Sequence, residues 1–373
     1  MKRIYLDHAA TTPLFPEARD AMLPWLGEGF GNPSSLHAEG RAAKAAIDAS
    51  REKFADAFGC LFGEVIFTGS GTEAANLAVI GGALKSDRRR VLLGAAEHHC
   101  VLHTKGLLEH LGYQVELIPV DREAVVHPDA VQGLLADDVA LVSVMHANNE
   151  FGSINPVAEI AEQAHRVGAV FHVDAVQTFP GDWQVADLGA DMVSVSAHKF
   201  YGPKSVGALY CRAGVELQPL VLGGGQEREM RAGTENIAGI VGAGVALDWV
   251  RAHPSSRREA RDAFESALTI EREMSAVSAE RLDGHCHFRI SGLDAETFLI
   301  RLDREGISAS SGAACSSGSL EPSHVMIAAG RTEAEAREGL RFTFGKDSTV
   351  AEAERAAQIV NTVGQELLDK LRK

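Results

Sequence analysis

Two residues that could do chemistry together follow apolar runs in the middle of the chain. Lys199 comes just after the run 192–196, and Asp174 comes just after the run 169–173. A lysine amine held among apolar side chains has a lowered pKa and can act as a nucleophile. A lysine that forms a Schiff base and an aspartate that keeps a ring nitrogen protonated are the pair that pyridoxal phosphate requires. Together they favour this cofactor, whereas singly they are explained as well by a solvated lysine and a loop carboxylate.

Such a cofactor also needs a place for its phosphate, and the stretch Gly-Ser-Gly-Thr at 69–72 can supply one. This stretch lies between the apolar run 64–68 and an Ala-rich helix expected over 72–84. Free backbone N–H groups and the helix dipole attract an anion at such a junction. Gly71 and Thr72 are therefore candidate phosphate contacts, and the alternative is a plain turn.

Several histidines invite either a cofactor or a metal interpretation. His98 begins an expected helix, where its imidazole could lie on the cofactor ring and move protons near neutral pH. His99 and His103 share a helix face, but no glutamate stands beside them in HExxH order. His285 and His287 have no second pair of ligands at zinc-finger spacing. We therefore predict no metal site.

A cysteine and an arginine further along the chain could contact a substrate. Cys315 lies in the stretch 310–319, which is small, polar and rich in serine and glycine. We expect a loop there, with an exposed thiol that can form a nucleophilic thiolate; the other four cysteines are expected to be structural. Arg341 lies in the alternating run 340–344, where it could grip a carboxylate with two hydrogen bonds. A surface salt bridge is the alternative for this arginine.

The elements that must position these residues alternate between short apolar strands and longer helices. This alternation predicts an α/β fold with a mostly parallel sheet that helices cover on both faces. Ligands of such sheets bind beyond the carboxyl ends of the strands, which is where Asp174 and Lys199 stand. The expected strands are 64–68, 90–93, 115–119, 140–145, 169–173 and 192–196, and the expected helices between them are 72–84, 98–111, 128–135 and 156–167.

The pattern changes after a long Gly/Ala/Val helix expected over 239–250. The Pro/Ser-rich stretch 253–256 is the best candidate for a domain boundary. We expect a large domain of residues 14–252 and a small α+β domain of residues 1–13 and 253–373. The small domain should contain charged helices over 257–278 and 333–340, a strand over 288–291 and an amphipathic helix over 350–371.

Composition excludes several classes of protein. The 373 residues include 36 lysines and arginines against 51 aspartates and glutamates, a formal net charge of -15, which argues against nucleic-acid binding. No window approaches the ~18 consecutive apolar residues of a membrane span, and residues 1–8 do not read as a signal peptide. Five scattered cysteines without a CxxC pair indicate a reducing compartment. We therefore expect a cytoplasmic protein that binds neither nucleic acid nor membrane.

Nine segments, spread in one order over nearly the whole chain, resemble the NifS/IscS-type cysteine desulfurases. These belong to the class V aminotransferase group of the fold-type I pyridoxal phosphate enzymes. The resemblance implies that transferase fold, with a mostly parallel seven-stranded sheet in the large domain. The segments are YLDHAATTP (5–13), GNPSSLH (31–37), FTGSGTEAANLA (67–78), MHANNEFG (145–152), HVDAVQ (172–177), SAHKFYGPK (196–204), GGGQEREMRAGTEN (223–236), SSGAACSSGSLEPSH (310–324) and LRFTFG (340–345).

The resemblance also implies a role for each matched residue. Lys199 is similar to the lysine that carries pyridoxal 5'-phosphate, and Cys315 to the cysteine that takes up sulfur as a persulfide. Arg341 is similar to the clamp for the substrate carboxylate. The other implied contacts are Gly71, Thr72, Ser196 and His198 with the phosphate, Thr234 with the phosphate of the partner subunit, His98 stacked on the ring with a catalytic role, Asp174 with the ring nitrogen, Gln177 with the ring hydroxyl, and Asn149 with the ring or substrate.

The activity implied by the resemblance is removal of sulfur from L-cysteine. The Lys199 amine removes the Cα proton, and the Cys315 thiolate attacks the substrate sulfur, leaving L-alanine and a persulfide. A homodimer that passes sulfur to an acceptor or an iron–sulfur scaffold protein is expected. The alternatives are a selenocysteine lyase, another pyridoxal phosphate β-lyase or an aminotransferase, which would not need Cys315. A non-catalytic scaffold would be expected to have lost Lys199 or Cys315, and both are present.

Overall fold

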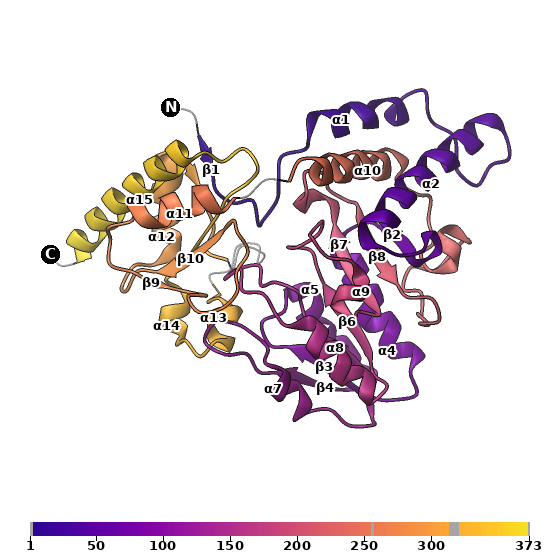
Figure 1. The fold of residues 1–373 in the computed structure, drawn as a ribbon, viewed down its shortest axis with the longest axis horizontal. Helices are drawn as coiled ribbons and strands as arrows, with labels where there is room; N and C mark the ends of the chain where they lie inside the picture. The colour runs from indigo at the N-terminus through magenta and orange to yellow at the C-terminus, as the bar shows by residue number, and fades with distance from the viewer. Residues whose placement is uncertain (1–2, 255–256, 313–320, 372–373) are drawn as a thin grey trace.

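The computed structural model describes residues 3–254, 257–312 and 321–371, so the predicted loop with Cys315 lies outside the described residues (Figure 1). A seven-stranded sheet forms the centre of the larger body, in the strand order β2-β8-β7-β6-β5-β3-β4. Its strands are β2 (Val65–Thr68), β3 (Arg90–Gly94), β4 (Gln114–Ile118), β5 (Val139–Ser143), β6 (Val170–Asp174), β7 (Met192–Ser196) and β8 (Gly207–Cys211).

The sheet is mostly parallel, which confirms the predicted fold class. The pairs β3–β4, β3–β5, β5–β6 and β6–β7 are parallel, and β8 runs antiparallel to both β2 and β7. Sequence analysis missed β8. No helix separates it from β7, because the chain returns through the short 3-10 turn η4 (Ala197–Lys199), so the strand–helix alternation gives no signal for it.

Helices and apolar side chains cover both faces of the sheet. Neighbouring residues of a strand point to opposite faces, and accordingly Leu141 and Val142 belong to two different hydrophobic clusters. The helices of this body are α1 (Pro16–Met22), α2 (Ala38–Phe58), α3 (Gly71–Asn76), α4 (Gly82–Lys85), α5 (His99–Leu102), α6 (Thr104–His110), α7 (Pro128–Gln132), α8 (Val157–Arg166), α9 (Val185–Leu188) and α10 (Ile237–Ala252).

Two predicted helices of this body are not regular α-helices over their whole length. The predicted helix 72–84 consists of α3 and α4 joined by a π-helical turn, η3 (Leu77–Gly81). The predicted helix 98–111 is divided at His103 into α5 and α6. None of the helices in the described part of the chain combines the length and the apolar character needed to cross a bilayer.

A smaller body lies beside the sheet and holds both ends of the chain (Figure 1). Its three-stranded sheet has the order β12-β10-β9, and β1 pairs with β11 in a separate two-stranded sheet. Its elements are β1 (Ile4–Tyr5), α11 (Arg258–Ala267), β9 (Glu273–Met274), β10 (His285–Arg289), α12 (Ala295–Arg304), β11 (Ile307–Ser308), α13 (His324–Ala328), α14 (Glu333–Ala336), β12 (Gly339–Thr343) and α15 (Val350–Leu371).

Two helix predictions in the smaller body were too long. The predicted helix 257–278 ends at Ala267, and its continuation supplies β9, which pairs with β10. The predicted helix 333–340 ends at Ala336, because the apolar residues from Gly339 onward pair with β10 as β12. In both cases strand pairing overrode the charged, helix-favouring sequence.

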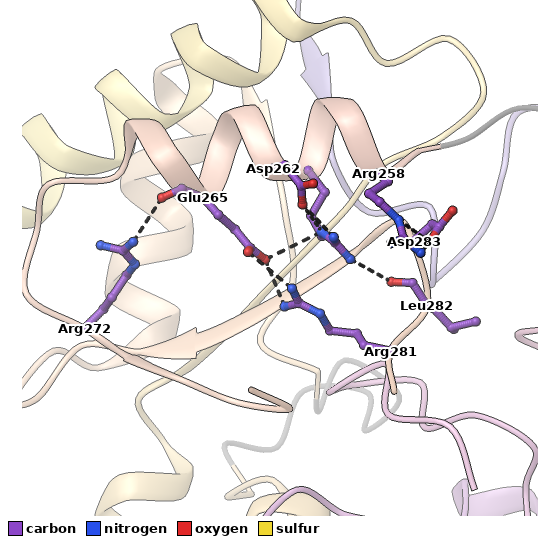
Figure 2. A network of polar contacts seen from close by, with 8 residues as sticks. Arg258, Asp262, Glu265, Arg272, Arg281, Leu282 and Asp283 are labelled. Atoms are coloured by element: carbon purple, nitrogen blue, oxygen red, sulfur yellow. Dashed lines mark hydrogen bonds and ion pairs between the residues drawn. The ribbon is translucent and has the colours of Figure 1, made fainter. Parts of the chain in front are cut away.

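A polar network fastens α11 to the segment that leads into β10 (Figure 2). Glu265 accepts two hydrogen bonds from the Arg281 guanidinium, at 2.9 and 3.2 Å. Arg272 donates to the backbone carbonyl of Glu265 at 3.0 Å, and Arg258 forms an ion pair with Asp283 at 2.7 Å. The core behind this network includes Ile4 and Leu6 together with side chains from residues 260–363. That core is compatible with the domain division proposed from the sequence, whose boundary stays a prediction.

Candidate active site

Most of the predicted site residues lie at the carboxyl ends of parallel strands. Asp174 is the last residue of β6, and Ser196 is the last residue of β7. His98 follows β3, and Asn149 follows β5. Because these strands are parallel, their carboxyl ends share one edge of the sheet. Residues separated by up to 98 positions of sequence are thereby brought to one place.

Lys199 stands at the end of turn η4, directly after β7. Its ammonium group donates to the backbone carbonyl of Ala9. The Gln177 side chain donates to the same carbonyl at 3.1 Å. Burial has the largest effect on the pKa values of Asp174 and His98, raising the first and lowering the second, and the charge of Lys199 acts on both. These groups therefore lie within electrostatic reach of one another. The structure therefore brings together four of the predicted site residues: Lys199, Gln177, Asp174 and His98.

The N-terminal segment closes one side of this cluster. The His198 ring is 3.1 Å from the Thr11 hydroxyl, and the Thr12 backbone N–H and hydroxyl each donate to the His198 carbonyl at 2.9 Å. These contacts hold η4, and with it Lys199, against residues 9–12. Burial, followed by the nearby positive charge of Lys199, lowers the pKa of His198 to about 4, so this imidazole is neutral at neutral pH.

Asp174 is a buried carboxyl group with few partners. It accepts a hydrogen bond from the backbone N–H of Val176 at 3.0 Å, and the Cys100 sulfur lies 4.0 Å from its other oxygen. Burial raises the pKa of Asp174 to about 6, although the Val176 N–H and the charge of Lys199 act in the opposite direction. A cationic ring nitrogen would supply the counter-charge that such a buried carboxylate requires.

His98 is the N-cap of α5 and accepts a hydrogen bond from the Cys100 N–H at 3.1 Å. Burial and then the charge of Lys199 lower its pKa to about 4, so the ring is neutral at neutral pH. Beside it, the His99 ring stacks on His103 and contacts His324, with centroid distances of 4.7 and 4.3 Å. Within the described ranges, no group of three or more His, Cys, Asp or Glu side chains is arranged to hold a metal ion.

The predicted phosphate site lies where β2 leads into α3. Ser70 caps α3 by accepting the Glu73 N–H at 3.1 Å. Gly71 is tightly enclosed, because a Cβ at this position would lie only 2.9 Å from the Ser196 Cβ. Thr72 lines a cavity of about 290 Å³. Gly71 and Ser196 are thus brought together, and Thr72 follows Gly71 in α3. Thr234 is exposed on the surface of the single chain.

Arg341 is buried, so the surface salt bridge considered as an alternative is wrong. Its side chain is 3% exposed and contacts Asp7 at 2.9 Å and the backbone carbonyl of Asn149 at 2.8 Å. Two polar atoms beside this contact, Arg341 Nε and Asn149 Oδ1, are buried without a hydrogen-bond partner in the described part of the chain. Such unsatisfied groups are costly in a native protein and point to a ligand or water.

These residues fit pyridoxal phosphate. The cluster offers a lysine amine, a buried carboxyl group, a glycine-walled turn at a helix start and an orphaned amide oxygen. Lys199 would hold the aldehyde carbon, and Asp174 would hold the ring nitrogen. Gly71 would contact the phosphate, and Asn149 would contact the ring or the substrate.

Sequence analysis missed three polar residues of this region. Glu97 precedes His98, is fully buried, and accepts the Met145 N–H. Glu150 follows Asn149 and is 1% exposed. Cys100 lies beside Asp174. The signal that could have found the two glutamates is a charged residue directly next to a predicted site residue within a largely apolar stretch.

Comparison with known proteins agrees with this geometry. The family model described as aminotransferase class-V matches residues 4–356. A cysteine desulfurase IscS of Dictyoglomus turgidum is 43% identical, covering 100% of this chain and 96% of that protein. A cysteine desulfurase of Cereibacter sphaeroides is 43% identical, covering 98% and 97%.

Solved structures give the same result. A structure described as a NifS-like protein superposes with a TM-score of 0.90 at 31% identity, over 97% of this chain and 99% of that chain. A structure described as SspA in complex with cysteine has a TM-score of 0.83 at 33% identity, over 92% of this chain and 99% of that chain. The chain belongs to the aminotransferase class-V family, in its group of IscS-type cysteine desulfurases.

Proposed function

We propose that this chain is a pyridoxal phosphate-dependent cysteine desulfurase that converts L-cysteine to L-alanine and holds the sulfur as a persulfide on Cys315. The observation that carries the proposal is that Lys199 and Asp174 lie at the carboxyl edge of the seven-stranded sheet. Arg341, from β12 of the smaller body, contacts Asn149 at the same edge. The proposal is supported by full-length relatives that are named cysteine desulfurases.

Each residue of the cluster has a distinct task in this reaction. Pyridoxal phosphate, when bound, supplies an electron sink for the carbanion at the substrate Cα. Arg341 binds the substrate carboxylate, the Lys199 amine takes the Cα proton, and Asp174 holds the compensating negative charge. The Cys315 thiolate then attacks the substrate sulfur, so that an S–S bond forms as the C–S bond breaks.

The working form is proposed to be a homodimer, in which Thr234 reaches the phosphate of the partner subunit. Exposure of Thr234, and of large apolar side chains at Phe30 and Leu222, supports this assignment. The persulfide is proposed to pass to a sulfur-acceptor or iron–sulfur scaffold protein. We place the reaction in the cytoplasm, and the thiols of Cys60, Cys211 and Cys286, which form no disulfide, support a reducing compartment.

The proposal is tested by incubating purified protein with L-cysteine, without an acceptor, and measuring the mass of the Cys315 peptide. We expect a gain of one sulfur atom, with L-alanine as product. Cys315→Ala should retain the cofactor and still bind L-cysteine but release alanine only at a trace rate. Alanine release at the wild-type rate from Cys315→Ala would show a pyridoxal phosphate lyase instead. The matched control is Cys286→Ala, since Cys286 is buried in the core of the smaller body.

A further inference from the structure

Two described residues stand close to the ends of the stretch 313–320, in which Cys315 stands in the sequence, and we call them its borders. Gly312 lies before it and Ser323 after it, and both are buried. On the N-terminal side, Ser310 and Arg341 exchange backbone hydrogen bonds at 3.1 and 2.6 Å, and the Gly312 N–H donates to the Ser310 hydroxyl at 3.2 Å. On the C-terminal side, Ser323 caps α13 by accepting the Met326 N–H at 3.1 Å. The two borders are thus fixed to different elements.

The carboxyl group of Glu150 touches both borders. The Ser323 hydroxyl donates to Glu150 Oε2 in a buried hydrogen bond. The same oxygen lies 2.6 Å from where a Cβ on Gly312 would stand, so the carboxyl group packs directly on the Gly312 backbone. Gly312 also has a φ of +82°, a conformation that favours glycine. One buried side chain therefore joins two positions that are 11 residues apart in the sequence.

Glu150 is also tied to the residues that hold the substrate. It directly follows Asn149, whose carbonyl accepts a hydrogen bond from Arg341 at 2.8 Å. The Asn148 side chain accepts the Glu150 N–H at 2.9 Å and fixes its backbone. Burial raises the pKa of Glu150 to about 7, whereas the Ser323 hydrogen bond and the Arg341 charge lower it. A carboxyl group buried at this cost implies a specific task.

We propose that Glu150 is a positioning residue that fixes both borders of the sulfur-capturing segment to the substrate-holding pair Asn149 and Arg341. The proposal deepens the proposed function, because it assumes that Cys315 receives the sulfur. Glu150 acts through Gly312 and Ser323 and takes no part in proton transfer. Its task is to hold Gly312 and Ser323 in place relative to Asn149 and Arg341.

The first test separates substrate binding from sulfur capture. In Glu150→Ala, kcat should fall about 10- to 100-fold, the effect of a misplaced reacting group. The KM for L-cysteine should change less than about threefold, since the substrate contacts remain. Glu150→Gln keeps an oxygen that can accept the Ser323 hydrogen bond and should recover most of the lost rate. Equal losses in the alanine and glutamine variants would show that the charge is required, and the positioning proposal would be wrong.

Ser323→Ala removes the same hydrogen bond from the other side. It also removes a helix cap, so the matched control is Thr332→Ala, which removes the cap of α14 without touching Glu150. We expect Ser323→Ala to lose kcat with little change in KM, and Thr332→Ala to keep the wild-type rate. This pair decides the question even if Glu150→Ala does not fold. A wild-type rate in folded Ser323→Ala would overturn the proposal.

A second measurement does not depend on turnover. Hydrogen exchange of the substrate-free holoenzyme should quicken in peptides over 306–312 and 323–328 in both Glu150→Ala and Ser323→Ala, because local opening becomes easier. Exchange in Thr332→Ala should quicken only around α14. Unchanged exchange at 306–312 in Glu150→Ala would contradict the anchoring of that border. If Cys315→Ala also keeps full alanine release, the proposed function fails separately, because the exchange result does not involve the thiol.

Discussion

At the scale of single residues, the chain keeps several ionisable side chains buried in their uncharged form. His172 in β6 is fully buried between two hydroxyl groups, with ring nitrogens 2.8 Å from Ser143 Oγ and 3.1 Å from Ser194 Oγ. Burial lowers its pKa to about 3. The folded chain therefore keeps this ring neutral over most of the range between pH 6.5 and 3, whereas the ring of the unfolded chain takes up a second proton there.

This difference predicts that His172 makes folding sensitive to acid. Because the unfolded state binds more protons below pH 6.5, the stability that the neutral ring supports is present above that pH and is lost as the pH falls toward 3. The loss at pH 5 relative to pH 7 should be about 2 kcal/mol. Urea unfolding of wild type and of His172→Gln at pH 5 and pH 7 measures this loss. It is the difference between the two proteins in how much the free energy of unfolding changes between the two pH values.

Wild type and His172→Gln must be compared because other buried groups change the stability with pH in the opposite direction. Burial raises the pKa values of Asp174 and Glu150, so the folded state binds more protons there and loses stability as the pH rises through 4 to 7. These groups are common to both chains and cancel. An identical pH dependence in wild type and His172→Gln would contradict the predicted role of the buried ring.

At the scale of elements, sequence patterns predicted the strands and helices whose ends are set by nearby residues. The strands β6 and β7 and the helix α8 (Val157–Arg166) match the predicted ranges within about two residues, because apolar runs and turn residues mark their ends. The strands β8 and β9 were missed, since β8 lacks a crossover helix and β9 lies in a charged stretch. Their formation depends on pairing with β7 and β10, which no local pattern reports.

The candidate site likewise contains residues that the sequence predicted and residues that it did not. Asp174 and Lys199 were predicted because each follows an apolar strand. Glu150 was missed because its partners, Gly312 and Ser323, are more than 160 residues away. A short-range pattern identifies the residue that a strand presents, but only the folded chain shows which distant residues it meets.

The network at α11 gives a prediction that belongs to this scale (Figure 2). Glu265→Ala should lower the free energy of unfolding by ~1.5–3 kcal/mol, because it removes two charge-assisted hydrogen bonds to a largely buried Arg281. Asp262→Ala is the matched control, since the Asp262 side chain is 53% exposed, and should cost less than ~1 kcal/mol. Denaturant unfolding measures both. Equal losses would mean that the network does not fasten α11 to the segment before β10.

At the scale of the whole molecule, the single chain leaves large apolar side chains exposed. Leu36, Phe30 and Leu222 are 89%, 78% and 76% exposed. We take these side chains as candidates for an interface with a second copy of the chain, and Thr234 lies in the same stretch of sequence as Leu222. These observations favour a closed twofold dimer with the phosphate sites near the interface.

Light scattering should therefore report a dimer. Phe30→Glu and Leu222→Glu should shift it toward monomer and weaken retention of the cofactor, because a charge at the interface must be desolvated. Val277→Glu is the matched control, since Val277 is 72% exposed on the smaller body, and it should leave the dimer intact. A fully active monomer would contradict both the dimer and the assigned role of Thr234.

The path of residues 4–12 has a consequence for the order in which the protein can assemble during synthesis. The chain is made from its N-terminal end, yet Ile4 pairs with Ile307 and Asp7 with Thr343. These early residues must wait, unpaired, until nearly the whole chain has been made. The same residues then contact His198 and Lys199. Lys199 therefore receives its final neighbours only at the last stage of folding, which keeps incomplete chains from forming the finished site.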